Sequence, residues 1–421
     1  MATSGTRPGT SWSGTVDYGP GTLHRPSSLQ ELQVLVARSH RIRALGTRHS
    51  FSRVAASTND LVSVDAMPPS LDIDSARRTV RAGAGVRYGH VAQAAARQGL
   101  ALSNMGSLPH ISVGGSSSTG THGSGSRHPV LAASVRAIEM VTAGGDLLEL
   151  SRESTPDVFD GAVLSLGSLG VFTHLTLDLV PAFTLRQSVY LDLPPENMSQ
   201  DVVAAALDDA YSVSLFHSWT GSIDQIWVKQ QSDLPREDRW HGAHLAESSV
   251  HPLPSMPPHH CTDQSGEPGP SYERLPHFRM QFTPSSGDEI QSEYFVARED
   301  LVSAMTAVLP LAERIRPLLH VSEVRTVAAD QLWLSPAYER DSACIHFTWK
   351  HLPEKVEAVL PQIEAALTPF SPRPHWGKVS TIAPEVVTSL YPRLGDFQTL
   401  RDRLDPDRTF ANDYVDQFLG A

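Results

Sequence analysis

Cysteine is nearly absent from this 421-residue sequence, in which only Cys261 and Cys344 occur. Two cysteines cannot form a disulfide framework in a chain of this length, which favours a reducing compartment. Positive charge is also scarce, since 34 Lys and Arg face 46 Asp and Glu and the net charge is −12. We therefore expect no nucleic-acid partner and no anionic membrane surface, and an uncharged small molecule fits better.

Long hydrophobic runs are missing as well. The longest apolar run, residues 301–312, is too short to cross a bilayer, and residues 1–18 are polar and rich in Gly, Ser and Thr. Hydrophobic residues nevertheless make up 40% of the chain, which is enough for two or three domains with their own cores. The expectation is a soluble, cytoplasmic protein that acts as a monomer.

The spacing of apolar residues predicts an α+β fold. Ser28-Leu-Gln-Glu31 is a capping box that begins a helix reaching His40, and a strand follows at 42–45. The pattern of predicted strands and helices changes after Pro181, where we place a domain boundary. A third segment begins at residue 375. Before the boundary we expect strands at 61–64, 79–82, 135–141, 147–150 and 171–179 with a helix at 88–98; after it, strands at 321–327 and 344–349 with helices at 299–312 and 353–367.

Three tracts of small residues, 42–51, 107–126 and 166–170, interrupt this pattern. The tract 107–126 has too few apolar residues for a core and is predicted to be a loop that binds a ligand. Glycine-rich turns present backbone N–H groups that suit phosphate. Neither common nucleotide fingerprint is matched, because 83–89 misses the GxGxxG spacing by one residue and 115–121 lacks the Walker lysine. Two such loops can grip one pyrophosphate from opposite sides.

His49 ends the first tract. A neutral imidazole dominates near pH 7, so His49 can attack an electrophilic cofactor methyl group. A capping or packing role is the commoner one for a lone histidine after a strand. His259-His260-Cys261 has no partner pair at zinc-ligand spacing, and no metal site is predicted.

Polar pairs at i, i+2 mark two predicted strands. Glu323 and Arg325 would share one strand face, as would His346 and Thr348, where carboxylate and guanidinium can accept from and donate to hydroxyls. Lys378 follows Trp376-Gly377 and can stabilise negative charge on an alcohol oxygen. A surface ion pair, an ordinary strand face and a solvated lysine are the respective alternatives.

Three segments taken together resemble the flavin domain of the vanillyl-alcohol oxidase flavoproteins. Their sequences are RALGTRHS, SLPHISVGGSSSTGTHGSG and LSLGSLGVFTHL. Within these flavoproteins, PHWGK at 374–378 and the Glu323-Val-Arg325 triplet resemble the sugar-alcohol and aldonolactone oxidases. The resemblance covers nearly the whole chain. It implies a two-domain α+β fold, in which residues 1–181 and 375–421 form a split FAD-binding domain and residues 182–374 form an inserted α+β substrate domain.

The resemblance also implies residue roles toward FAD. His49 would be joined covalently to the flavin, and Gly106, a position where this family has either a small or a blocking residue, would leave O2 a path. Arg48 departs from the pattern, since many members have glycine there, and would either add charge to the phosphates or cover the loop. The implied cofactor-binding residues are Ala44, Leu45, Gly46, Thr47, Arg48, His49, Ser50, Ser107, Ser112, Gly115, Thr119, Gly120, Thr121, His122, Val171 and His375.

The implied reaction is the oxidation of the terminal primary hydroxyl of an alditol such as xylitol, sorbitol or glycerol to the aldose, by hydride transfer to flavin N5 with O2 reduced to H2O2. Arg325 and Lys378 would help the hydroxyl to lose its proton. Ser107, Glu323, Arg325, His346 and Thr348 would bind the substrate. An aldonolactone or other sugar oxidase or dehydrogenase, and a flavin- or carbohydrate-binding protein without turnover, remain as alternatives.

Overall fold

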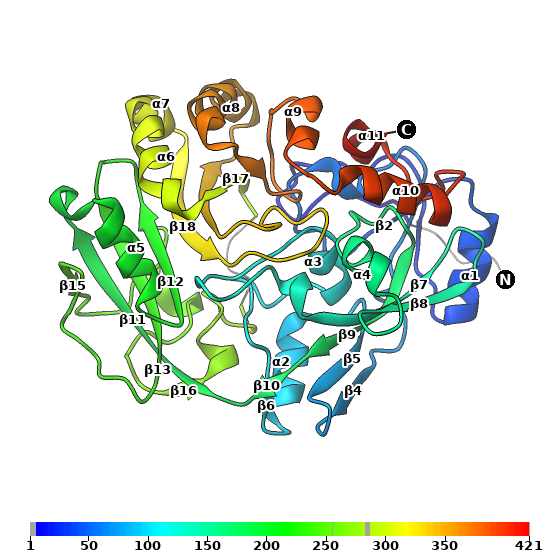
Figure 1. Ribbon diagram of the computed structural model, residues 1–421, viewed down its shortest axis with the longest axis horizontal. Coiled ribbons are helices and arrows are strands. Elements are labelled where there is room, and N and C mark those ends of the chain that lie inside the picture. The colour runs from blue at the N-terminus through cyan, green and yellow to red at the C-terminus, as the bar shows by residue number, and fades with distance from the viewer. Residues whose placement is uncertain (1–5, 255, 283–286, 421) are drawn as a thin grey trace.

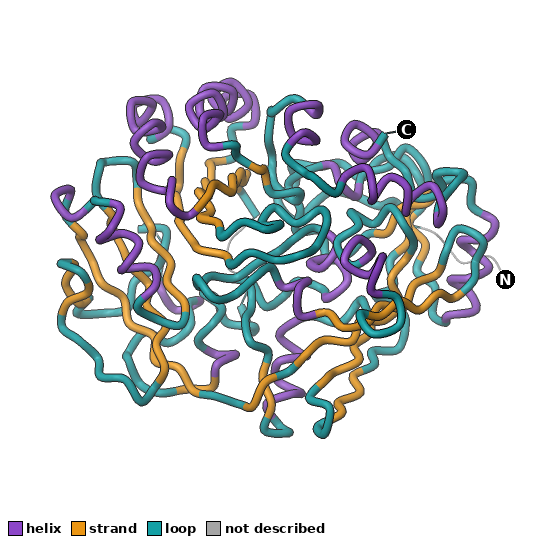
Figure 2. The backbone as a smooth tube through the Cα atoms, viewed as in Figure 1, coloured by secondary structure: helices purple, strands orange, loops and turns teal. Residues whose placement is uncertain are grey.

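A computed structural model of the chain describes residues 6–254, 256–282 and 287–420. Helices and strands are mixed along the whole chain (Figures 1 and 2), which confirms the α+β class. The predicted capping box is present at the start of α1 (Leu29–Arg38), where the Ser28 hydroxyl accepts from the Glu31 N–H at 3.2 Å. The Glu31 carboxylate reaches back one residue further than expected and accepts from the Ser27 N–H at 2.8 Å.

Two small sheets lie in the part of the chain before residue 180. A parallel sheet has the order β1 (Leu23–His24), β3 (Asp60–Val62), β2 (Ile42–Ala44). A second, antiparallel sheet has the order β4 (Leu71–Asp74), β5 (Thr79–Gly83), β9 (Val171–Asp178), β7 (Val135–Val141), β8 (Leu147–Ser151), and helices α2 (Tyr88–Ala96) and α4 (Pro156–Ala162) accompany it. The short strands β6 (Leu100–Ala101) and β10 (Val180–Pro181) pair with each other.

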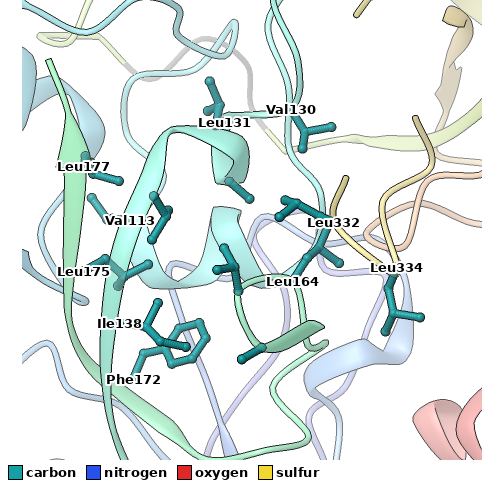
Figure 3. Packing of buried hydrophobic residues seen from close by; sticks show 14 of the residues in the cluster. Val113, Val130, Leu131, Ile138, Leu164, Phe172, Leu175, Leu177, Leu332 and Leu334 are labelled. Atoms are coloured by element: carbon teal, nitrogen blue, oxygen red, sulfur yellow. The ribbon is translucent and has the colours of Figure 1, made fainter. Parts of the chain in front are cut away.

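The prediction of a loop throughout 107–126 is wrong, because this tract contains a buried helix, α3 (Val113–Ser118). Val113 packs among Ile138, Leu164 and Leu175 in the core cluster (Figure 3). The small residues are what allow this burial, since a Cβ on Gly114 would lie only 2.9 Å from the Ala84 Cβ. A tract that looks polar in sequence is therefore a close-packed element in space.

A ten-stranded sheet dominates the other half of the molecule. Its order is β14 (Arg239–Trp240), β15 (Ala243–Leu245), β11 (Thr184–Leu193), β13 (Ile223–Gln231), β12 (Ser212–His217), β18 (Leu319–Val327), β19 (Ser342–Lys350), β17 (Glu289–Ala297), β20 (Arg373–Pro374), with β16 (Gly269–Pro270) against β11. Helices α5 (Gln200–Asp208), α6 (Leu301–Val308) and α8 (Pro353–Leu367) cover one face of this sheet (Figure 1). The helix predicted at 299–312 is interrupted after α6 by a 3-10 turn at Pro310, which lacks an N–H, and ends as α7 (Ala312–Ile315).

The two faces of the large sheet differ in chemistry. Along β19, Phe347 and Trp349 join the core beneath the helices, whereas the alternate residues His346 and Thr348 point to the opposite face. That opposite face borders the cavity described below. The alternation of side chains thus separates a core face from a site face within one strand.

The C-terminal segment packs against the beginning of the chain, as the red and blue ribbons of Figure 1 show. It contains α9 (Pro384–Ser389), α10 (Leu394–Leu404) and α11 (Asp413–Leu419). The Asn412 amide donates to the carbonyls of Arg53, Val54 and Ala56, and the Phe51 N–H donates to the Gly377 carbonyl at 2.7 Å. Within the described residues, no helix is both long enough and apolar enough to pass through a membrane. The domain limits at 181 and 374 stay a prediction.

Candidate active site

A cavity of about 490 Å³ runs between the small-residue loops and the large sheet. The loops 43–51, 106–122 and 166–172 line one part of it, and strands β17, β18 and β19 line the other. Residues 375–378, which follow β20, lie where these parts meet. One continuous space therefore connects a glycine-rich cradle to a polar strand face.

The cradle is formed where two loops touch. A Cβ on Gly46 would lie 3.1 Å from the Ser112 Oγ and 3.5 Å from the Gly115 Cα, so a side chain would push the loops apart. The Thr47 hydroxyl accepts from the Ser112 N–H at 3.3 Å and joins them. The Ser112 Oγ is buried and has no hydrogen-bond partner among the described residues. A phosphate that lies against the two loops, on the cavity side, would supply that partner.

His49 lies on the first loop with its Nδ1 3.1 Å from the Thr47 Oγ1 and its ring 5.7 Å from the Trp12 ring. Burial lowers the pKa of His49 to about 4, and the positive charges of His110, Arg87 and Lys378 act in the same direction. The imidazole is therefore neutral at pH 7. A neutral ring that is held by one nitrogen keeps the other as a nucleophile.

Most of the predicted cofactor residues line the cavity. They are Ala44, Leu45, Gly46, Thr47, Arg48, His49, Ser50, Ser107, Ser112, Gly115, Thr119, Thr121, His122, Val171 and His375. Gly120 does not, since it turns with φ 72° against Pro336 and Leu164. Gly120 allows the chain to turn at this point, and its contact with the cofactor stays a prediction.

Arg48 contacts residues that precede the first loop, and its two predicted roles toward the cofactor stay predictions. Its guanidinium donates to the Pro8 carbonyl at 2.6 Å and lies 5.8 Å from the centre of the Tyr18 ring. The residue itself has φ 66°, a conformation that glycine adopts without strain. Arg48 thus ties the loop 43–51 to residues 8–18.

A row of polar side chains crosses the site face of the large sheet. Glu323 on β18 pairs in register with His346 on β19, and His346 with Glu293 on β17. Arg325 lies between the carboxylates, with its Nη2 2.5 Å from the Glu293 Oε1 and its Nε 3.6 Å from the Glu323 Oε2. Because Glu323 and Arg325 are each only 6% exposed, the alternative of a surface ion pair is wrong.

Glu293 was missed in the sequence, although the signal was present. Glu289, Gln291 and Glu293 repeat the i, i+2 spacing that singled out Glu323 and Arg325, and all of them line the cavity. Burial alone would raise the pKa of Glu293, but the charges of Arg325, His122 and His346 outweigh it and hold this pKa well below its usual range. Glu293 is therefore a buried anion at pH 7.

Glu293 also has donor atoms of His122 and Cys344 within 4.8 Å, the spacing that a metal ion would need. A metal would require the Cys344 thiolate, and burial raises the pKa of that thiol well above its usual range. The Glu293 Oε1 is already 2.5 Å from Arg325 and 3.3 Å from the His122 Nε2. This donor set favours ion pairing over metal binding.

Lys378 and His375 come from the C-terminal side of the cavity. The Lys378 ammonium donates to the Gln291 side-chain carbonyl and lies 5.4 Å from the centre of the Phe51 ring. Burial lowers the pKa of Lys378 to about 8, with Glu293 partly opposing the shift. The His375 Nδ1 accepts from the Gly377 N–H at 2.9 Å, which shapes the turn before Lys378. Lys378 lines the cavity and is not a freely solvated lysine.

Two family models match the chain, one described as an FAD-binding domain over residues 21–151 and one as D-arabinono-1,4-lactone oxidase over residues 285–418. The chain is also 46% identical over 415 residues to an alditol oxidase from Streptomyces sp. (strain IKD472 / FERM P-14339), covering 97% of this chain and 98% of the relative. The chain belongs to the FAD-dependent alditol and aldonolactone oxidase family. The Gly46–Gly115 cradle is consistent with FAD as the cofactor of this family member.

More distantly related proteins match this chain in length and in fold. An L-gulono-1,4-lactone dehydrogenase from Mycobacterium tuberculosis is 28% identical, and the match covers 97% of this chain and 98% of the relative. Among solved structures, cholesterol oxidase from B. sterolicum superposes with a TM-score of 0.78 at 15% identity, covering 97% and 96% of the two chains. Xylooligosaccharide oxidase from Myceliophthora thermophila C1 has a TM-score of 0.73 at 14% identity, covering 98% and 96%. These oxidases share the vanillyl-alcohol-oxidase-type fold, which confirms the predicted fold class.

Proposed function

We propose that this family member oxidises the terminal primary hydroxyl of an alditol to the aldehyde of an aldose and transfers the two electrons to O2. One alcohol and one O2 give one aldehyde and one H2O2, so atoms and electrons balance. The observation that carries the proposal is the buried group of Glu323, Arg325 and Glu293. This group borders the same cavity as the small-residue loops 43–51, 106–122 and 166–172, which we call the flavin-type loops. The 46% identity to an alditol oxidase supports the same substrate class.

A polyol suits this strand face because it offers only hydroxyl groups. Each buried hydrogen-bonding group that a substrate leaves unpaired costs about 1–3 kcal/mol, so a charged pocket discriminates strongly in favour of hydroxyl-rich ligands. We propose Ser107, Glu323, Arg325, His346 and Thr348 as the substrate-binding residues. The His346 Nε2 lies 3.1 Å from the Thr348 Oγ1, so this pair offers a ready donor and acceptor.

We propose Arg325 and Lys378 as the catalytic residues. Bound FAD supplies the acceptor for two electrons and the hydrogen of the carbinol carbon. The two cations stabilise the negative charge that grows on the substrate oxygen as its proton leaves. Glu293 orients the Arg325 guanidinium, and Gln291 holds the Lys378 ammonium.

The pKa of Lys378 predicts how the rate depends on pH. If the protonated ammonium stabilises the substrate oxygen, kcat/KM should fall above about pH 8, by about tenfold for each pH unit, because deprotonation removes the charge. Lys378→Arg should move this decline above pH 10, since a guanidinium stays charged. The measurement is a pH profile of initial rates with xylitol. A wild-type rate that rises through pH 9 would show instead that Lys378 acts as a neutral base.

We further propose that FAD is joined covalently to the family member through His49, whose neutral imidazole lies at the edge of the cradle. Acid precipitation of the wild-type protein should leave a yellow pellet. His49→Ala should release all flavin to the supernatant, whereas His110→Ala, a histidine outside the cavity lining, should keep a yellow pellet. A colourless wild-type pellet would refute the linkage.

A substrate panel with peroxide detection tests the reaction itself. Activity on alditols is expected. Activity on aldonolactones alone would favour the alternative that the protein is an aldonolactone oxidase or dehydrogenase. A yellow protein that no polyol bleaches without O2 would point to binding without turnover. We propose that Gly106 leaves the path of O2 open because it has no side chain, whereas an added Cβ would fill the space next to the His122 carbonyl, 3.6 Å away. If the enzyme oxidises an alditol with an artificial dye as electron acceptor but not with O2, this role of Gly106 is contradicted.

A further inference from the structure

The irregular segment between β15 and β17, residues 246–280, has no role in the scheme above. The described part of this segment nevertheless borders the cavity through His251, Leu253, Met256, His277 and Phe278. It is fastened to the flavin-type loops, because the N–H groups of His277 and Phe278 both donate to the Ser107 carbonyl, at 3.2 and 3.3 Å. The segment therefore reaches the substrate side of the site.

His277 connects this segment to Glu323. The His277 Nε2 lies 2.9 Å from the Glu323 Oε1. Burial disfavours the Glu323 carboxylate, but Arg325 and His277 prevail and hold the pKa of Glu323 well below its usual range. An ionised carboxylate only accepts, so the His277 Nε2 must carry the proton and donate it.

Lys229 on β13 fixes that arrangement from the far side of the ring. Burial lowers the pKa of His277 to about 4, so the ring is neutral and its Nδ1 is an acceptor. The Lys229 Nζ lies 3.1 Å from this Nδ1 and also donates to the Leu275 carbonyl. A hydrogen-bonded chain thus runs from Lys229 through His277 to Glu323, and each donor in it has a fixed direction.

The surroundings leave this chain little freedom. Lys229 is 2% exposed and His277 is 3% exposed. The rings of Phe216 and Trp227 pack edge-on against the imidazole, with centroids 5.5 and 5.1 Å away. The Glu323 Oε1 already accepts from His277, whereas the Oε2, 3.6 Å from the Arg325 Nε, accepts no hydrogen bond among the described residues and keeps its acceptor sites for a substrate hydroxyl.

We propose that Lys229 and His277 are positioning residues for substrate binding, which hold Glu323 with its Oε2 turned toward the hydroxyl groups of the polyol. This inference rests on the proposed function, in which Glu323 binds the substrate. It gives the segment 246–280 a purpose, since the segment contributes the histidine that aims the carboxylate. Lys229 acts only through His277 and never touches the substrate.

The test compares His277→Leu, Lys229→Met and the double variant in the flavin-loaded enzyme, with xylitol as substrate. His277→Leu should raise KM at least about tenfold with kcat within about threefold, because hydrogen bonds to a charged group bind the substrate away from the reacting carbon. Lys229→Met should raise KM in the same way. The double variant should be no worse than His277→Leu, since residues that act in series are not additive.

Rescue and matched controls separate positioning from damage to the fold. His277→Gln keeps a side-chain N–H donor and should restore most of the wild-type KM. His217→Leu, a buried histidine on the neighbouring strand, and Lys350→Met, whose ammonium also holds a backbone carbonyl, should leave KM unchanged. An unchanged KM in Lys229→Met, or additive effects in the double variant, would overturn the proposal. If His277→Leu does not fold, Lys229→Met and His277→Gln decide alone. A wild-type enzyme without alditol activity would instead disprove the proposed function.

Discussion

Replacing Arg325 by methionine is expected to lower kcat/KM for xylitol by about a thousandfold. The guanidinium is the charged donor that lies between Glu323 and Glu293, so its loss removes stabilisation of the substrate oxygen and leaves two buried carboxylates facing each other. Loss of one well-placed donor for a developing negative charge costs about 10²–10³ in rate, and the repulsion between carboxylates adds to it. Steady-state kinetics with peroxide detection measure the effect.

The fold of the Arg325→Met variant needs its own control. Arg373 on β20 is also buried and donates to the carbonyls of Pro336, Tyr338 and Leu390, but it does not line the cavity. Arg373→Met should lower the melting temperature and leave the KM for xylitol unchanged. Arg325→Lys should recover part of the lost rate, because it restores the charge without the fork of donors. Full activity in Arg325→Met would remove Arg325 from the catalytic scheme.

Glu293→Gln is expected to lower the free energy of unfolding by about 3 kcal/mol, because breaking a buried ion pair leaves its partner charge uncompensated. The partners are Arg325 and, through their ring nitrogens, His122 at 3.3 Å and His346 at 3.5 Å. Arg325 would then be drawn toward Glu323 alone, so the KM for xylitol should rise as well. Chemical denaturation followed by flavin fluorescence measures the first effect, and kinetics measure the second.

Glu364 provides the matched comparison for Glu293. It is a buried carboxylate on α8 that accepts from the Tyr294 hydroxyl at 2.7 Å, and it does not line the cavity. Glu364→Gln should therefore destabilise the fold without changing KM. If both variants change stability and neither changes KM, Glu293 has no part in binding the substrate.

The periodic spacing of side chains and the chemistry of neighbouring residues were enough to predict some features of the fold and the site. The capping box at Ser28 needs only four neighbouring residues, and the shared face of Glu323 and Arg325 follows from the alternation of any strand. Such features depend on the backbone next to them. They could therefore be predicted without knowing which element packs against them.

Other features depend on contacts between distant segments. Glu289, Gln291 and Glu293 have the pattern of an exposed strand edge, and only the placement of β17 beside β19 makes them a buried site. Helix α3 was missed because its small residues signal a loop, whereas the closeness of Ala84 to Gly114 makes them core. His277 lies 46 residues from Glu323 in sequence, so nothing local links the two.

The order of the chain has a consequence for how the protein folds. The Ile42 N–H donates to the Thr409 carbonyl and the Phe51 N–H to the Gly377 carbonyl, so the strand and loop that lead to His49 are held by residues far later in the sequence. Contacts between such distant residues form only after both have been synthesised. The loop around His49 therefore reaches its final hydrogen bonding only when the segment 377–409 has been made and has packed against it.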